Sequence, residues 1–150
     1  MTIWNAMKSA IIAAIVLAFV PTSVSAQETA LTGVWLFPNK RFEVAIGPCG
    51  EQLCGKIAWL KSPMDEQGQP RTDHANADPA LRQRPLLGLT VLEGLRQVDD
   101  RTWEDGTIYN ADDGSSYSAT LSIASDGTLH VHAYEFVPLL GKTIVMTRVS

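Results

Sequence analysis

Few side chains in this sequence have the chemistry and spacing of a functional site. Cys49 and Cys54 are the only two cysteines, and four residues separate them. In an oxidising compartment such a close pair forms a structural disulfide. A redox pair is the alternative, but the spacing is C-x4-C rather than C-x-x-C, and two thiolates alone make a poor metal site. The spacing therefore favours a structural bridge over a redox or metal-binding role.

The three histidines are His74, His130 and His132. Two histidines at positions i and i+2 of a strand share one face, which is half of a metal site. Because they alternate with Leu129 and Val131, we expect the apolar pair to face the core and the histidines to face solvent. No third ligand can be placed, so we predict no metal.

Oxygen donors gather at Asp73, Asn76 and Asp78, but their spacing does not match a calcium-binding loop. We interpret them as a turn and, at Asp78, as the cap of one helical turn that begins at Pro79. The sequence contains no serine elbow, no phosphate-cradling glycine loop and no dinucleotide fingerprint. We therefore predict no enzyme and no cofactor, and a catalytic site in a barrel mouth is the least favoured hypothesis.

The elements that position these residues are strands. Apolar and polar residues alternate with the period of half-buried strands, most clearly at residues 115–124 and 128–136. Asp126-Gly127 between them is a strong hairpin signal, and Gly94 indicates a β-bulge. Eight strands are predicted, at residues 31–37, 41–47, 56–60, 86–98, 102–109, 115–124, 128–136 and 142–149.

Short turns join most of these strands, and only residues 61–85 form a long, polar connection. An eight-stranded antiparallel meander can close on itself, with an interior that fits side chains or one small ligand. The predicted fold class is therefore all-β, an eight-stranded antiparallel up-and-down barrel in one domain. A two-sheet sandwich is the alternative.

The first 26 residues have the features of a secretory signal peptide. Lys8 is their only charged side chain, residues 10–20 are all apolar, and Val24-Ser-Ala26 fits the small-x-small cleavage pattern. The apolar run is about half as long as a bilayer span. We predict cleavage after Ala26 and a periplasmic or secreted domain at residues 27–150. An uncleaved anchor is the alternative, and Met7 is an alternative start of translation.

The charge of the chain limits its partners. Loss of Lys8 with the signal peptide takes the formal net charge from −4 to −5. An acidic domain is a poor match for nucleic acid or an anionic membrane surface, so neither is predicted as a partner. No membrane span is predicted once the signal peptide has been removed.

Several segments together resemble the exported bacterial family catalogued as domain of unknown function 2147 (DUF2147). They are Gly33-Val-Trp35, Pro48-Cys-Gly50, Leu53-Cys-Gly-Lys-Ile57, Trp59-Leu60, Asp78-Pro-Ala-Leu-Arg82, Arg84-Pro-Leu-Leu-Gly88, Gly106, Ile108-Tyr109, Tyr117-Ser-Ala119, Pro138-Leu-Leu-Gly141 and Thr147-Arg148. The resemblance implies a lipocalin-like barrel with no established reaction. Gly33, Trp35 and Arg148 also resemble the lipocalin signature, in which the tryptophan packs under an arginine at the closed end.

In an antiparallel meander the successive turns lie alternately at the two ends of the barrel. The long or apolar connections in this chain are alternate ones, so we expect all of them at one end, which forms the rim. Barrel mouths are preferred ligand sites. We therefore predict a mouth for a small lipophilic or amphipathic molecule, with Arg82 and Arg84 available for an acidic headgroup. The alternative is that these apolar residues plug the barrel, which then serves as a structural or protein-interaction module. The predicted mouth residues are Phe37, Trp59, Arg82, Arg84, Leu86, Leu87, Tyr109, Phe136, Leu139 and Leu140.

Overall fold

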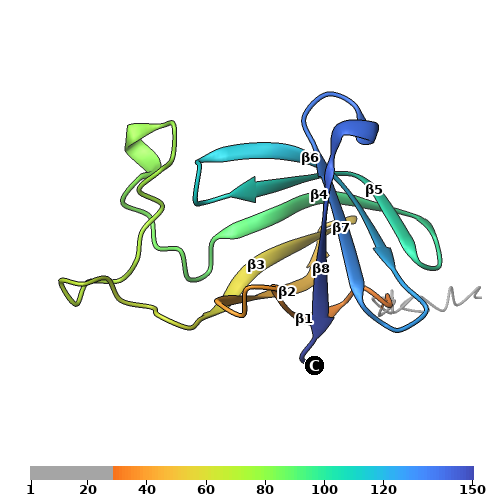
Figure 1. The fold of residues 1–150 in the computed structure, drawn as a ribbon, viewed down its shortest axis with the longest axis horizontal. Helices are drawn as coiled ribbons and strands as arrows, with labels where there is room; N and C mark the ends of the chain where they lie inside the picture. The colour runs from red at the N-terminus through yellow and green to blue at the C-terminus, as the bar shows by residue number, and fades with distance from the viewer. Residues whose placement is uncertain (1–28) are drawn as a thin grey trace, which may run out of the picture.

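The structure is a computed structural model that describes residues 29–150. The predicted signal peptide and its cleavage after Ala26 lie outside the described residues. Eight strands and two short 3-10 helices make up the fold (Figure 1). They are β1 (Gly33–Leu36), β2 (Phe42–Cys49), β3 (Gln52–Leu60), η1 (Pro79–Leu81), β4 (Thr90–Asp99), β5 (Thr102–Asn110), β6 (Ser115–Ile123), β7 (Leu129–Tyr134), η2 (Pro138–Leu140) and β8 (Lys142–Arg148).

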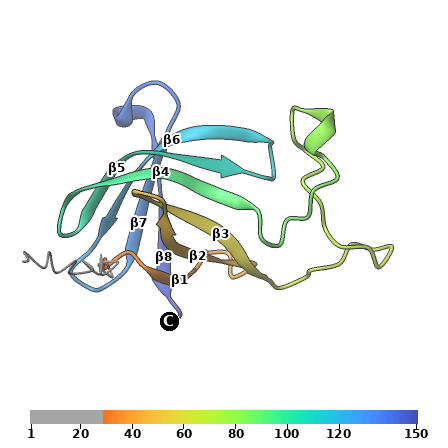
Figure 2. The same cartoon turned by 180° about the vertical axis from the view of Figure 1, so that it is seen from behind.

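The strands pair in sequence order, each antiparallel to the next, and β8 pairs with β1 to close the barrel (Figures 1 and 2). The predicted eight-stranded up-and-down barrel is therefore confirmed, and the sandwich alternative is wrong. All the predicted strands form, with shifts of a few residues at their ends. Among residues 29–150 we find no helix with the length and apolar character that a membrane span requires.

Local sequence explains the β6–β7 hairpin. Leu129 and Val131 are fully buried while His130 and His132 are only half-buried, as their alternation predicted. At the turn, Gly127 adopts a positive φ of 83°, which a glycine reaches without steric cost. The Asp126 carboxylate accepts a hydrogen bond of 2.9 Å from the Thr128 amide. The hairpin signal is confirmed.

The fourth strand shows one confirmed and one wrong prediction. The β3–β4 register gains one extra β4 residue between Leu92 and Leu95, so the bulge at Gly94 is confirmed. The strand was predicted from Leu86, but β4 begins at Thr90. The Leu89 amide bonds instead to the Leu86 carbonyl at 3.0 Å, and Gly88 adopts a φ of 85°. These residues form a turn because only glycine enters that conformation readily.

The closed end is filled by a tryptophan and an arginine. Trp35 is fully buried, and its indole nitrogen donates to the Leu31 carbonyl at 2.9 Å. The Arg148 guanidinium lies 4.1 Å from the Trp35 ring centroid, a cation–π contact, and donates to the carbonyls of Thr32 and Ala30. A side chain at Gly33 would collide with Arg148. The predicted signature of Gly33, Trp35 and Arg148 is confirmed as part of the fold.

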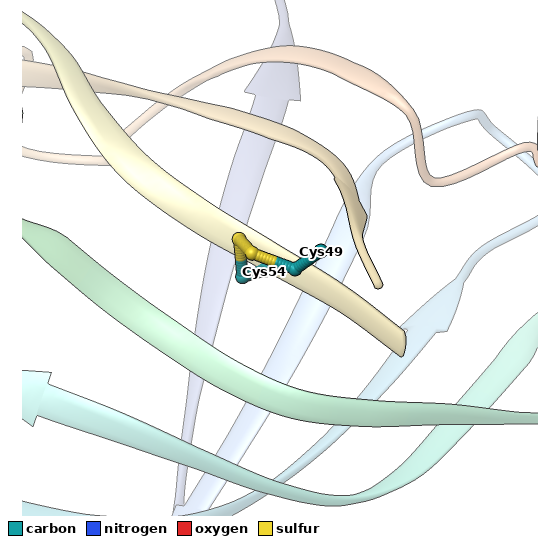
Figure 3. Close-up of a disulfide and its surroundings, with 2 residues drawn as sticks. All are labelled: Cys49 and Cys54. Atoms are coloured by element: carbon teal, nitrogen blue, oxygen red, sulfur yellow. A yellow bond between two sulfur atoms is a disulfide. The ribbon is translucent and has the colours of Figure 1, made fainter. Parts of the chain in front are cut away.

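The cysteines form the predicted bridge at the tip of the β2–β3 hairpin (Figure 3). Cys49 ends β2 and Cys54 lies near the start of β3, with their Cα atoms 5.6 Å apart. No cysteine is free in the described part of the chain. The bridge therefore fixes the hairpin register next to the closed end.

The closure between β1 and β8 is short. Only two residue pairs join the strands, Trp35 with Arg148 and Leu36 with Thr147. Residues 142–146 of β8 pair with β7 on one side and with no described strand on the other. In Figures 1 and 2, β8 meets β1 only near the C-terminus, and β3 continues into the long connection on the other side of the barrel wall. We call this unpaired side of residues 142–146 the seam.

Candidate functional site

The barrel encloses a cavity of about 1120 Å³ that opens at the end opposite Trp35. Inward-facing apolar side chains from most strands form its walls. The stacked rings of Phe37 and Phe42, with centroids 4.3 Å apart, add aromatic surface. The barrel is therefore hollow at the predicted mouth and not plugged. Its apolar wall residues include Val44, Ile57, Leu60, Leu86, Val91, Leu92, Ile108, Ala133, Ile144 and Met146.

Charged side chains lie around the mouth of the cavity. Four are cationic and three are acidic, so the rim carries no strong net sign. One of the cations, Arg71, is held by a hydrogen bond of 2.8 Å from its Nε to the Ser62 carbonyl. An apolar interior below a charged rim suits a ligand with a lipophilic body and a polar end. The charged rim residues are Arg41, Lys61, Arg71, Lys142, Asp65, Asp112 and Glu135.

The predicted mouth residues divide into three groups. Phe37, Leu86, Tyr109 and Leu140 line the cavity. Arg84 and Leu87, again with Tyr109, line a smaller hollow of about 520 Å³ that the turn before β4 forms against β4, β5 and β6. The remaining four, Trp59, Arg82, Phe136 and Leu139, line neither space.

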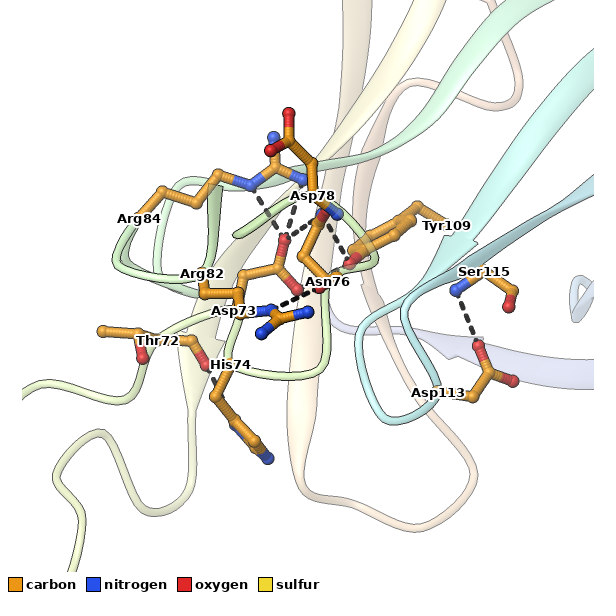
Figure 4. A network of polar contacts seen from close by, with 10 residues as sticks. All are labelled: Thr72, Asp73, His74, Asn76, Asp78, Arg82, Arg84, Tyr109, Asp113 and Ser115. Carbon is orange, nitrogen blue, oxygen red and sulfur yellow. Dashed lines mark hydrogen bonds and ion pairs between the residues drawn. The ribbon is translucent and has the colours of Figure 1, made fainter. Parts of the chain in front are cut away.

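A buried carboxylate anchors the long connection between β3 and β4 (Figure 4). Asp73 is fully buried, and its carboxylate accepts hydrogen bonds from the Tyr109 hydroxyl at 2.6 Å and the Asn76 amide at 2.8 Å. Arg84 adds an ion pair at 2.8 Å. The Asn76 amide also donates to the Tyr109 hydroxyl at 2.9 Å. Asp73 was predicted only as a turn residue, and this network corrects that interpretation.

The network explains the direction of two pKa shifts. Burial of Asp73 opposes ionisation, but the hydrogen bonds from Tyr109, Asn76 and Arg84 outweigh it and lower the pKa of the carboxyl. Burial and the neighbouring Asp73 carboxylate together raise the pKa of the Tyr109 phenol. Asp73 is therefore an anion at neutral pH, and Tyr109 is a neutral donor to it.

Arg82 and Arg84 were predicted to be available for an acidic headgroup, but both bind partners within the long connection. Arg84 pairs with Asp73, and its guanidinium lies 5.5 Å from the Tyr109 ring centroid. The Nε of Arg82 donates to the Asn76 carbonyl at 2.7 Å. At the start of η1, Asp78 accepts a hydrogen bond from the Ala80 amide at 2.9 Å, so the predicted helix cap is confirmed. These contacts give the arginines a structural role in the connection.

Sequence reasoning missed all four cationic rim residues, Arg41, Lys61, Arg71 and Lys142. A signal existed for all except Arg71, because each of the others lies at or next to a predicted strand end at the open rim. The histidine pair is placed as predicted on the outer face of β7, and no group of three metal-binding side chains occurs within residues 29–150. His132 instead contacts the Pro138 carbonyl and the Thr143 hydroxyl.

An eight-stranded up-and-down barrel, sealed at one end by tryptophan and arginine and hollow at the other, is a lipocalin-like barrel. The chain belongs to the family described as uncharacterized protein conserved in bacteria (DUF2147), whose profile matches residues 33–148. It is similar to a solved structure described as protein HP1028 from the human pathogen Helicobacter pylori, which belongs to the lipocalin family. The TM-score is 0.67 at 25% identity, covering 81% of this chain and 84% of that chain. No curated protein matches the chain.

Proposed function

We propose that this protein binds a small lipophilic or amphipathic molecule inside its barrel. The observation that carries the proposal is the cavity of about 1120 Å³, which has mostly apolar walls and opens at the end opposite Trp35. Ligand pockets in proteins commonly hold about 300–1,000 Å³, so the space is large enough for one such molecule. The likeness to a lipocalin-family protein supports the same class of function.

The distribution of polar groups suggests the orientation of the ligand. The lipophilic body would lie against β2, β3, β4, β5, β7 and β8, while its polar end would stay among the charged rim residues. We propose binding without chemistry, because the buried Asp73 and its partner Tyr109 are committed to holding the long connection. We also propose export to the periplasm or beyond, where the Cys49–Cys54 disulfide is stable.

Native mass spectrometry of protein purified from its host, followed by lipid extraction, tests the proposal directly. We expect a bound small molecule that leaves the protein on denaturation. The affinity of the apolar dye N-phenyl-1-naphthylamine gives a second measurement, which does not depend on the identity of the natural ligand.

A substitution that fills the cavity tests whether the dye binds inside the barrel. Ala133 lies on β7 in phase with buried Leu129 and Val131 and lines the cavity. We expect Ala133→Phe to weaken dye binding about tenfold or more, because its ring occupies ligand space. Ala58→Phe is the matched control, since Ala58 is exposed on β3 and lines neither hollow. Equal dye binding by both folded variants, with no extractable molecule, would contradict the proposal.

A further inference from the structure

The connection between β7 and β8 carries a strongly exposed apolar surface. Phe136 is 84% exposed, Leu139 92% and Leu140 82%, and the neighbouring Val137 is 46% exposed. We call these four residues the apolar tip. Figure 1 shows the connection projecting from the barrel beyond the ends of β7 and β8. Exposed apolar patches on monomers usually mark contact sites for another surface.

Contacts at the base of the connection hold the tip away from the barrel. The Nε2 atom of His132 lies 2.6 Å from the Pro138 carbonyl oxygen, to which it donates. Its Nδ1 atom lies 3.0 Å from the Thr143 hydroxyl. A side chain at Gly141 would collide with the His132 ring, so the chain passes the ring closely at this position. The tip is therefore presented on a supported turn, with Phe136, Val137 and Leu139 outside the cavity and Leu140 at its edge.

The apolar tip is continuous with the cavity. Leu140 lines the cavity, and the lining continues along β8 through residues 142–146. Val145 belongs to this lining although its neighbours Ile144 and Met146 are the inward-facing residues, so the cavity reaches the seam. Phe37 and Pro38, which follow the end of β1, also line the cavity. Leu140, Ile144 and Met146 thus offer a lipophilic molecule apolar contacts from the tip to the interior, with Lys142 of the charged rim between them.

We propose that the apolar tip inserts into a lipid surface and that the ligand enters the barrel from that surface, beside the seam. Ligand entry from the lipid surface rests on the proposed function, whereas insertion of the tip does not. The tip is a convex projection of large side chains, which fluid acyl chains can surround without a matched pocket. The predicted mature domain has a net charge of −5, so burial of apolar surface, and not attraction to anionic lipid, supplies the driving force.

Flotation with neutral phosphatidylcholine vesicles tests insertion, using protein exported by a bacterial host with its N-terminus established by intact mass. We expect Phe136→Ser combined with Leu139→Ser to lower vesicle partitioning by at least about 30-fold, because two large apolar side chains no longer enter the lipid. Neither residue lines the cavity. Val98→Ser combined with Val149→Ser is the matched control, since these exposed apolar residues lie at the closed end and should leave partitioning unchanged.

Transfer kinetics test the entry route. For the unchanged protein, the rate at which a fluorescent fatty acid moves from vesicles to protein should rise with vesicle concentration, as transfer by collision requires. The tip variant should lose that dependence while its equilibrium affinity for the dye N-phenyl-1-naphthylamine stays within about twofold, because the cavity is intact.

Each result decides one part of the inference. Equal partitioning of the two double variants, or no partitioning of the unchanged protein, would overturn insertion. Dimerisation or capture of a protein partner that depends on the tip, without vesicle binding, would overturn it as well. If the vesicles bind but no dye or fatty acid enters the barrel, insertion stands and the proposed function fails.

Discussion

Asp73 shows how a single side chain can define the position of a long connection. It is a fully buried carboxylate in a segment that is otherwise mostly exposed. Two of its partners, Asn76 and Arg84, belong to the same connection, and the third, Tyr109, belongs to β5. A buried charge is stable only when such partners compensate its desolvation. The hydrogen bonds of the Tyr109 hydroxyl therefore join this network to the barrel wall.

Replacing Tyr109 by phenylalanine should loosen the connection. The change removes the hydroxyl that donates to Asp73 at 2.6 Å and accepts from Asn76 at 2.9 Å, while it keeps the ring. We expect a loss of about 1–3 kcal/mol in docking free energy, because a buried carboxylate loses one donor. Limited proteolysis within residues 61–89 should show faster cleavage.

Tyr117→Phe provides the matched control for this prediction. The Tyr117 hydroxyl donates to Asp113 at 2.9 Å in an exposed setting, where such a bond contributes little. Cleavage should then stay near the rate of the unchanged protein. If both variants are cleaved equally fast, the Asp73 network does not hold the connection.

The pKa of Asp73 gives this docking a pH dependence. The folded-state pKa lies below the ordinary value of 3.8, so the stabilisation is complete above that value and is lost as the pH falls through the folded-state pKa. We expect the Arg84 side-chain Nε–H resonance to shift in NMR spectra as the ion pair breaks in this acid range. Asp73→Asn should abolish that titration while acid effects on the barrel remain. A titration midpoint at or above 3.8 would contradict the assignment.

At the residue scale, sequence predicts contacts that are local and misses those that are distant. The Asp78 cap was predictable because its partner, the Ala80 amide, lies two residues away. Asp73 meets Arg84 and Tyr109 across separations of 11 and 36 residues. No spacing rule specifies such partners, because the fold must first bring β5 against the connection. The sequence pattern therefore could not predict that the Asp73 carboxylate is buried.

At the scale of elements, the β2–β3 hairpin combines a strand ladder with a covalent bridge. The bridge joins Cys49 to Cys54 across a short loop next to the closed end. Removing both cysteines by Cys49→Ser and Cys54→Ser should cost about 2 kcal/mol of unfolding free energy, because the unfolded chain regains the freedom that the short loop removed. Urea unfolding measures the difference.

Chemical reduction is the control for the disulfide prediction. A thiol reductant should lower the stability of the unchanged protein by a similar amount and leave the double variant unaffected. A loss that appears only in the double variant would instead point to a packing effect of the substituted side chains, since Cys54 is buried.

Strand prediction succeeded where one face of the strand is buried and the other is polar. β6 and β7 follow such alternation over their whole length, and both were found within two residues of the predicted limits. The start of β4 was wrong because Leu86, Leu87 and Leu89 continue an apolar pattern through a turn at Gly88. Apolar side chains in that turn line the two hollows, which periodicity alone does not distinguish from a strand.

At the scale of the whole molecule, the sequence predicted the barrel but not whether it is empty. Alternation indicates which side chains point inward, yet it does not give the distance between opposite walls. The closed end is filled by Trp35, Trp103 and neighbouring aliphatic residues, whereas the open end retains a large cavity. The space inside a barrel depends on strand tilt and stagger, which all eight strands set together.

The short closure between β1 and β8 also implies an uneven pattern of amide hydrogen exchange along one strand. The Val149 amide donates to the Val34 carbonyl, so alternate residues of β8 direct their backbone groups toward β1 and the others toward β7. The amides of Thr143 and Val145 thus face the seam, while those of Ile144 and Met146 face β7. We expect deuterium to replace the first pair about tenfold or more faster than the second. Uniform protection from Lys142 to Met146 would mean that the cylinder is shut along its full length in solution.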